Sequence, residues 1–283
     1  MKKKLYVLCL VVCFMFNMAG VAGASSEASS MSNNIAPNMG IQIQPTQAWL
    51  QAAEQEYQSD TNRVQEQINQ TPAEFVSNNA NGNSVTRATT TVYTGTNYTF
   101  SQADCGAHGA YDTYNEDNGN FKHGWGTTSG GYADALAQYT IMGHQSATTW
   151  AWVGKAIKVS GTRQARITYD GAWADYLIGF TTPVLTRGTV KISVYNATDG
   201  TEVASKTIVN NSNYTGIPVI DSDDFNDYLD VNLVNGKTYY LKMQCWAYVG
   251  AGAYGMADLI SSNDVPARGG DGVDYNSINI SWL

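Results

Sequence analysis

Hydrophobic and polar residues alternate over much of the last two thirds of the chain. The clearest case is 164–170, where Ala165, Ile167 and Tyr169 alternate with polar side chains. Such period-two spacing predicts a strand with one buried and one solvated face. The same pattern predicts strands at 190–195, 202–209, 229–233, 239–246 and 278–282, with further strands near 89–93, 97–100, 150–159 and 176–180. Residues 132–141 fit either a strand or a helix.

Strands at intervals of about ten to fifteen residues, with turn signals between them, are typical of antiparallel sandwiches and barrels. We therefore predict an all-β domain at 89–283, built as an antiparallel β-sandwich. Residues 233–239 and 274–282 resemble the general pattern of jelly-roll ligand-binding modules, so a jelly roll is the favoured topology. A fold does not fix a function, which has to be argued from individual side chains.

One turn between two of these strands allows a prediction of register. It contains Asn235-Gly236, a strong signal for a two-residue hairpin loop. A two-residue loop would set apolar side chains of one strand beside polar ones of the next, since a slip of one residue flips every side chain. A three-residue loop ending at Lys237 pairs Val231 with Leu241 and keeps the apolar side chains on one face. We predict this hairpin, with Gly236 or Lys237 in the left-handed conformation.

The N-terminal 88 residues differ in character from the rest. Three lysines at 2–4, an apolar run at 5–16 and small residues at 22–24 form the layout of a secretory signal peptide over residues 1–24. The alternative is an uncleaved membrane anchor, for which the apolar run is short. Residues 25–88 are predicted to hold a flexible tail, one helix and a linker.

The predicted helix covers about 47–70 and is amphipathic. Thr46 is a suitable N-cap. Apolar side chains recur at helical spacings of three, four and seven at Leu50, Ala53, Tyr57, Val64 and Ile68. Two interpretations stay open: the helix packs on the β domain, or it acts as a pro-segment or an oligomerisation helix.

Composition excludes several classes of protein. The chain has 283 residues, 43% of them hydrophobic, and its seven Trp, eighteen Tyr and seven Phe are too many aromatics for a disordered chain. The formal net charge of −8, with no basic cluster beyond residues 2–4, argues against a nucleic-acid partner.

Two cysteines, Cys105 and Cys245, lie beyond the predicted signal peptide. In an exported protein they most simply form one disulfide, here closing a loop of about 140 residues. The alternative is a pair of buried or metal-bound thiols. Cys105 is also close in sequence to His108, a pairing that would suit a zinc site or a Cys–His catalytic pair.

An acidic stretch supplies a candidate calcium site. Calcium prefers six to eight oxygen ligands, which loops between strands provide readily. The candidate ligands are Asp221, Asp223, Asp224 and Asp227. The alternative is a solvated acidic turn.

The strand at 239–246 and its continuation place aromatic side chains on the face opposite the apolar one. This predicted ligand-binding face consists of Tyr240, Trp246 and Tyr248. Aromatic rings on a sheet face are suited to stacking on sugars, with polar neighbours binding the hydroxyls. The alternative is that the other sheet, a loop or the N-terminal helix covers these rings.

These features predict a secreted or cell-surface β-sandwich that binds a glycan or another extracellular partner without catalysis. Two alternatives remain: a structural or assembly protein of the cell envelope, with self-association through the helix, and a secreted hydrolase. No catalytic residue is assigned. Glycoside hydrolysis needs two facing carboxylates, and the β region has only two glutamates, Glu116 and Glu202, while the aspartates that could serve instead cluster at turns. Calcium is the one cofactor predicted, and no membrane span is expected after signal cleavage.

Overall fold

The computed structural model describes residues 45–70, 89–111, 120–127, 131–139, 146–179, 184–215, 217–250, 255–259 and 272–283. The predicted signal peptide, most of the tail and the linker lie outside these residues. The described elements are α2 (Gln47–Gln70), β1 (Thr90–Tyr93), β2 (Tyr98–Ser101), the 3-10 helix η1 (Gln102–Asp104), β3 (Ala107–Tyr111), β4 (Asn120–Thr127), β5 (Tyr132–Tyr139), β6 (Ala147–Ser160), β7 (Arg163–Gly179), β8 (Leu185–Asn196), β9 (Thr201–Asn213), β10 (Val219–Leu233), β11 (Thr238–Gly250), β12 (Gly255–Leu259) and β13 (Val273–Trp282).

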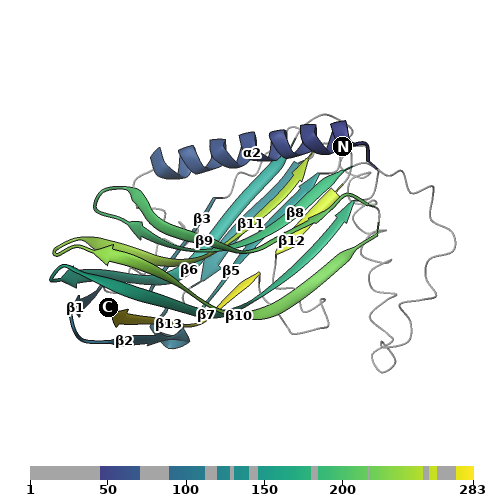
Figure 1. Ribbon diagram of the computed structural model, residues 1–283. Helices are drawn as coiled ribbons and strands as arrows, with labels where there is room; N and C mark the ends of the chain where they lie inside the picture. The colour runs from purple at the N-terminus through teal and green to yellow at the C-terminus, as the bar shows by residue number, and fades with distance from the viewer. Residues whose placement is uncertain are drawn as a thin grey trace, which may run out of the picture. The chain divides into compact units, whose positions relative to one another are not determined.

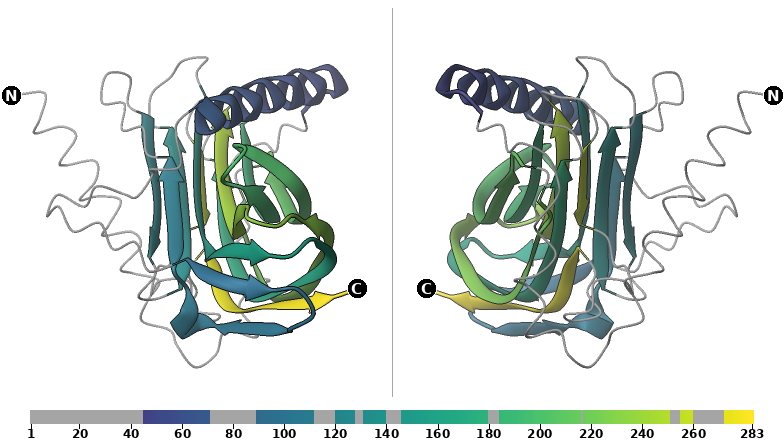
Figure 2. Two further views of the ribbon diagram at one scale, coloured as in Figure 1. Left: turned by 90° about the vertical axis from the view of Figure 1, so that its left-hand side faces the viewer. Right: turned by 90° about the vertical axis from the view of Figure 1, so that its right-hand side faces the viewer.

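Strands β5 to β12 form two packed sheets with jelly-roll topology (Figure 1, Figure 2). The order is β6-β11-β8-β9 in one sheet and β10-β7-β12-β5 in the other. Among these eight strands only β8 and β9 are neighbours both in the chain and in a sheet, so the other six of the seven connections cross between the sheets. Two interleaved four-stranded sheets of this kind make a jelly roll, and the predicted all-β sandwich is confirmed.

The remaining strands extend both sheets. β1 and β3 lie beside β6, while β2, β4 and β13 join the second sheet. β12 and β13 both run antiparallel to β7, the first opposite residues 176–179 and the second opposite residues 165–173. β12 and β13 therefore lie one after the other along the same edge of β7 and run in the same direction.

The predicted strands fall inside longer ones. Residues 164–170 and 176–180 were expected as two strands but, apart from residue 180, belong to β7. The alternation ends after Asp170 because β7 is then buried on both faces over much of its length, so a period-two signal no longer marks it. Residues 132–139, for which helix and strand were both open, form strand β5.

The core fills the space between the two sheets. Alternate residues of β11 point into it from one sheet, and those of β7 and β10 from the other. Fully or almost fully buried members are Ile167, Tyr169, Leu229, Val231, Leu233, Tyr239, Leu241, Met243 and Cys245. The Tyr169 hydroxyl donates a 2.8 Å hydrogen bond to the Ser193 carbonyl of the facing sheet, which satisfies its polar end inside the core.

The expected hairpin between β10 and β11 is wrong. β10 pairs with β7, which sets Val231 opposite Ala165. β11 pairs with β6 and β8, which sets Leu241 opposite Lys155 and Val194. The two strands lie in different sheets, so their apolar residues share one interior but face each other across it.

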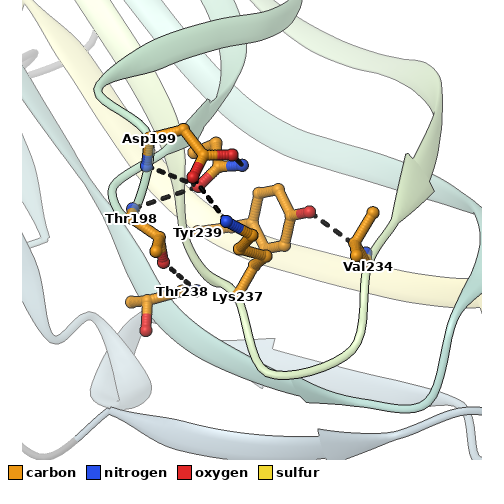
Figure 3. A network of polar contacts seen from close by, with 7 residues as sticks. Thr198, Asp199, Val234, Lys237, Thr238 and Tyr239 are labelled. Atoms are coloured by element: carbon orange, nitrogen blue, oxygen red, sulfur yellow. Dashed lines mark hydrogen bonds and ion pairs between the residues drawn. The ribbon is translucent and has the colours of Figure 1, made fainter.

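The turn at residues 234–237 connects the two sheets, and a network of polar contacts fixes its position (Figure 3). Gly236 has φ +78°, the left-handed conformation expected there. Its N–H donates to the Val159 carbonyl at 2.8 Å, and the Lys237 carbonyl accepts from Val159 N–H at 3.0 Å. Lys237 Nζ contacts Asp199 Oδ1 at 2.5 Å, and the Tyr239 hydroxyl accepts from the Val234 N–H at 3.0 Å. The turn is thus tied to β6 and to the β8–β9 turn.

Polar contacts close the sandwich edge between β9 and β10. Lys206 forms an ion pair with Asp227 at 2.7 Å. The Asn211 side-chain amide donates to Asp175 at 3.0 Å and to Asp221 at 3.2 Å. Asp175 is 2% exposed, and burial raises its pKa to about 7.

The expected disulfide is not present. Cys105 and Cys245 are buried thiols. The Cys105 Sγ donates to the Gly154 carbonyl of β6 at 3.5 Å, whereas Cys245 lies on β11 opposite Ala151. Along residues 150–154, β6 pairs with β3 on one edge and β11 on the other, so β6 separates the two thiols.

We expect peptide mapping to find both cysteines reduced. After unfolding in guanidinium without reductant, peptides containing Cys105 and Cys245 should each carry one alkyl group, while the native protein should label slowly because both thiols are buried. Burial also raises the pKa of Cys245 well above its usual value, which lowers its thiolate fraction. A cross-linked pair of these peptides would contradict the arrangement.

Asp175→Asn should change how stability depends on pH. An unfolded aspartate titrates near 3.9 and the folded one near 7, so the wild-type free energy of unfolding falls as pH rises between these values. Asparagine keeps the shape and the acceptor for Asn211. We expect the variant to exceed wild type at pH 8 by about 1–3 kcal/mol and to match it more closely at pH 4, in urea denaturation. An equal difference at both pH values would refute the assignment.

Candidate functional site

The candidate site lies on the outer face of the sheet formed by β6, β11 and β8. Since the odd-numbered residues of β11 fill the core, its even-numbered residues point away from it. Six aromatic side chains from the three strands gather there and are called the aromatic face: Trp150, Trp152, Tyr195, Tyr240, Trp246 and Tyr248.

Helix α2 lies along the β domain (Figure 1), and its side chains cover one half of the aromatic face. Val64 packs with Trp150 and Trp246, and the Tyr57 ring meets the Tyr248 ring edge-on at 5.1 Å. Trp246 and Tyr248 are therefore only 7% and 1% exposed. Two of the three predicted ligand-binding residues thus lie beneath the helix rather than at the surface.

The helix itself matches its predicted bounds and packs on the β domain. The Thr46 hydroxyl accepts the Trp49 N–H at 3.2 Å, as expected of an N-cap. Ala53 and Val64 from the predicted apolar stripe are buried, while Leu50 and Tyr57 are partly exposed. Within the part of the chain that the structure describes, no helix has the length and hydropathy needed to cross a membrane.

A buried arginine joins α2 to the sheet. Arg187 on β8 is 5% exposed and donates two hydrogen bonds, of 3.1 and 2.7 Å, to the Glu54 carboxylate. Its guanidinium lies 4.1 Å from the centre of the Tyr57 ring. The hydrogen bond from Arg187 holds the pKa of Glu54 below its usual value. A two-pronged contact of this kind fixes orientation as well as adding energy.

The other half of the aromatic face surrounds two partly exposed tyrosines. Tyr195 and Tyr240 lie opposite each other on β8 and β11, with parallel rings whose centres are 6.4 Å apart. Trp152 on β6 packs against Tyr240 at 5.5 Å. Tyr240 is therefore the one predicted ligand-binding residue that keeps an accessible ring, and Tyr195 beside it was not predicted.

Lys242 occupies the centre of this half. Its Nζ lies within 6 Å of four ring centres: 4.2 Å from Tyr195, 4.7 Å from Trp152, 5.5 Å from Trp150 and 5.9 Å from Tyr240. Burial lowers the pKa of Lys242 to about 7, although Glu202 and the rings favour the charged form. Alternation placed this lysine on the outer face, but nothing in the sequence indicated an aromatic cage around it.

Polar groups complete the site. The Gln244 side chain accepts a 2.7 Å hydrogen bond from the Trp150 indole and donates to Ser193. Lys191 and Glu202 form a partly exposed ion pair at 2.9 Å. Burial raises the pKa of Tyr240, so its hydroxyl stays neutral at physiological pH. The site thus combines ring faces with hydrogen-bonding groups of both kinds.

The predicted calcium ligands do not form a loop. Asp221, Asp223, Asp224 and Asp227 lie on the extended strand β10. Asp227 is paired with Lys206, and Asp221 accepts from Asn211. Among the described residues no group of three or more His, Cys, Asp or Glu side chains could hold a metal ion. Calcium binding stays a prediction without support from this geometry, and charges along an exposed edge strand also discourage pairing with other chains.

Comparisons with known proteins assign neither a family nor a function to this chain. No family model matches, and no curated protein matches. A carbohydrate-binding module of family 6 from a Zobellia galactanivorans laminarinase is 11% identical, covering 66% of this chain and 99% of its own, with a TM-score of 0.21.

Two other solved structures are similarly distant. A Clostridium thermocellum xylanase fragment is 9% identical over 58% of this chain and 24% of its own, with a TM-score of 0.21. The structure of an infectious bursal disease virus strain is 12% identical over 65% and 35%, also with a TM-score of 0.21. At these values none of them assigns a function, which must come from the chemistry of the aromatic face.

Lys242→Met should change the pH dependence of stability in the opposite sense to Asp175→Asn. An unfolded lysine titrates near 10.4 and the folded one near 7, so its contribution to wild-type stability rises with pH across this range. The stability of the variant relative to wild type should therefore fall by about 2 kcal/mol between pH 7 and pH 9 in urea denaturation. Lys191→Met on the same face controls for net charge. A difference that does not vary with pH would mean that Lys242 stays charged.

Proposed function

We propose that this protein is an exported, non-catalytic glycan-binding protein that uses the accessible half of its aromatic face. The observation that carries the proposal is the parallel pair Tyr195 and Tyr240, partly exposed and backed by Trp152. Sugar rings have apolar C–H faces that stack on aromatic rings, and such anchors dominate binding energy when well packed.

The polar neighbours suit the rest of a sugar. Neutral tyrosine hydroxyls donate and accept hydrogen bonds, and the Glu202 carboxylate beside Lys191 accepts them. The net charge of −8 disfavours a strongly acidic ligand. A neutral polysaccharide is therefore the ligand class that fits best.

Export is proposed from the N-terminal layout at 1–24. Secretion or display at the cell surface would bring the sheet face to extracellular glycans. Self-association through the helix, as in an envelope assembly protein, is less favoured because the apolar stripe of α2 packs on its own sheet. A hydrolase is less favoured because Cys245 is a buried thiol and Asp175 lies between the sheets, away from the aromatic face.

The test is binding to neutral polysaccharides in affinity gel electrophoresis and calorimetry. With hydroxyethylcellulose, xylan, pullulan and mannan as probes, we expect the full chain to bind at least one. Tyr195→Ala and Tyr240→Ala should each weaken that binding at least tenfold through loss of stacking. Tyr228→Ala removes an exposed tyrosine from β10 in the other sheet and should leave binding unchanged. Equal binding by all three variants would refute the proposal.

A further inference from the structure

We infer that α2 is a displaceable cover and that the sheet surface beneath it is the second half of the glycan-binding site. This inference rests on the proposed function and extends it to Trp150, Trp246 and Tyr248. The carrying observation is a group of buried polar atoms without partners at the seam between α2 and the sheet, beside the contacts that Glu54 makes with Arg187 and Asp60 makes with Ser146.

Buried polar atoms without a hydrogen-bond partner gather at this seam. The described residues contain five such side-chain atoms, and four of them lie on α2 or directly beneath it: Thr61 Oγ1, Thr148 Oγ1, Arg187 Nε and the Tyr248 hydroxyl. A buried polar group left without a partner weakens a contact substantially. These atoms are unused donors and acceptors beside aromatic rings, the combination that a sugar requires.

The helix buries only small side chains completely, and among its described residues these are Ala53 and Val64. Trp49 and Tyr57 of α2 also pack on the sheet but stay partly exposed. The buried rings at the contact, Trp150, Trp246 and Tyr248, belong to the sheet. Displacing α2 would therefore expose mainly aromatic faces and hydrogen-bonding groups of the sheet.

The two halves of the aromatic face are continuous. The Trp150 ring packs on Trp246 at 5.8 Å and also lies 5.5 Å from Lys242 Nζ, in the accessible half. Tyr240 and Tyr248 are eight positions apart on β11, or roughly 27 Å at about 3.4 Å per residue. A ligand of several sugar units that starts on Tyr240 would run along this line and under α2.

The Glu54–Arg187 contact is the best place for a substitution that releases α2 from the sheet. Glu54→Arg places two guanidinium groups together and should release α2 without altering any residue of the aromatic face. Gln55→Arg introduces the same side chain at the next helix position, which is exposed, and serves as the control for an added arginine; it changes the net charge by +1, against +2 for Glu54→Arg. Glu54→Gln, which keeps the shape, should give an intermediate effect.

Hydrogen exchange measures release independently of any ligand. In wild type, amides of residues 51–66 should exchange at least tenfold faster than those of β11, because α2 opens without unfolding the sandwich. Glu54→Arg should speed this exchange a further tenfold and leave β11 unchanged, whereas Gln55→Arg should change neither. Exchange of α2 and β11 at one common rate, or loss of β11 protection in Glu54→Arg, would overturn the inference.

Binding then separates this inference from the proposed function. We expect Glu54→Arg to bind the neutral polysaccharide at least tenfold more tightly than wild type, since a site that is open only part of the time shows proportionally weaker apparent affinity. Unchanged affinity with a released helix overturns the occlusion and leaves the proposed function standing. If neither protein binds any of the four polysaccharides, both the proposed function and the occluded glycan site are refuted.

Discussion

The structure depends on a strand that is buried on both faces. From Leu241 onward every residue of β11 is buried. Its odd-numbered side chains pack against the second sheet. Its even-numbered side chains lie on the outer face, where Trp246 and Tyr248 belong to the aromatic face and α2 covers them. Because neither face is open to water along most of its length, each polar side chain on this strand needs a partner from the protein itself, and this need organises the outer surface of the sheet.

The partners take two forms. Lys242 is surrounded by aromatic rings, and Gln244 is held between the Trp150 indole and Ser193. Farther along the sheet, Arg187 is held by Glu54 from the helix. The first two are satisfied by the sheet alone, so the accessible half of the face keeps its shape without α2. Only the other half depends on the helix.

The sequence predicted which side of each strand is buried better than it predicted strand partners. Alternation correctly placed Val231 and Leu241 in the interior, and the helix bounds agreed with the spacing of its apolar residues. The error was to take a shared interior for a shared sheet: Asn235-Gly236 resembles a hairpin turn, yet it connects opposite sheets. The alternation of apolar residues shows which way side chains point, whereas the pairing of strands depends on contacts between distant parts of the chain. For the same reason, alternation could place Trp246 and Tyr248 on the outer face but could not reveal that α2 covers them.

Two kinds of interface are combined in this molecule, and their hydrogen bonding distinguishes them. Between the sheets, Tyr169 and Tyr275 bury their rings and each donates to a backbone carbonyl, as expected of a permanent core. Between α2 and the sheet, Tyr248 is equally buried but its hydroxyl has no partner. Buried tyrosines in the core between the sheets are thus hydrogen-bonded, whereas the buried Tyr248 on the outer face of the β6-β11-β8 sheet is not. Contacts that fold a domain tend to have all their hydrogen bonds made, whereas the contact between α2 and the sheet leaves donors and acceptors that the proposed glycan site would use.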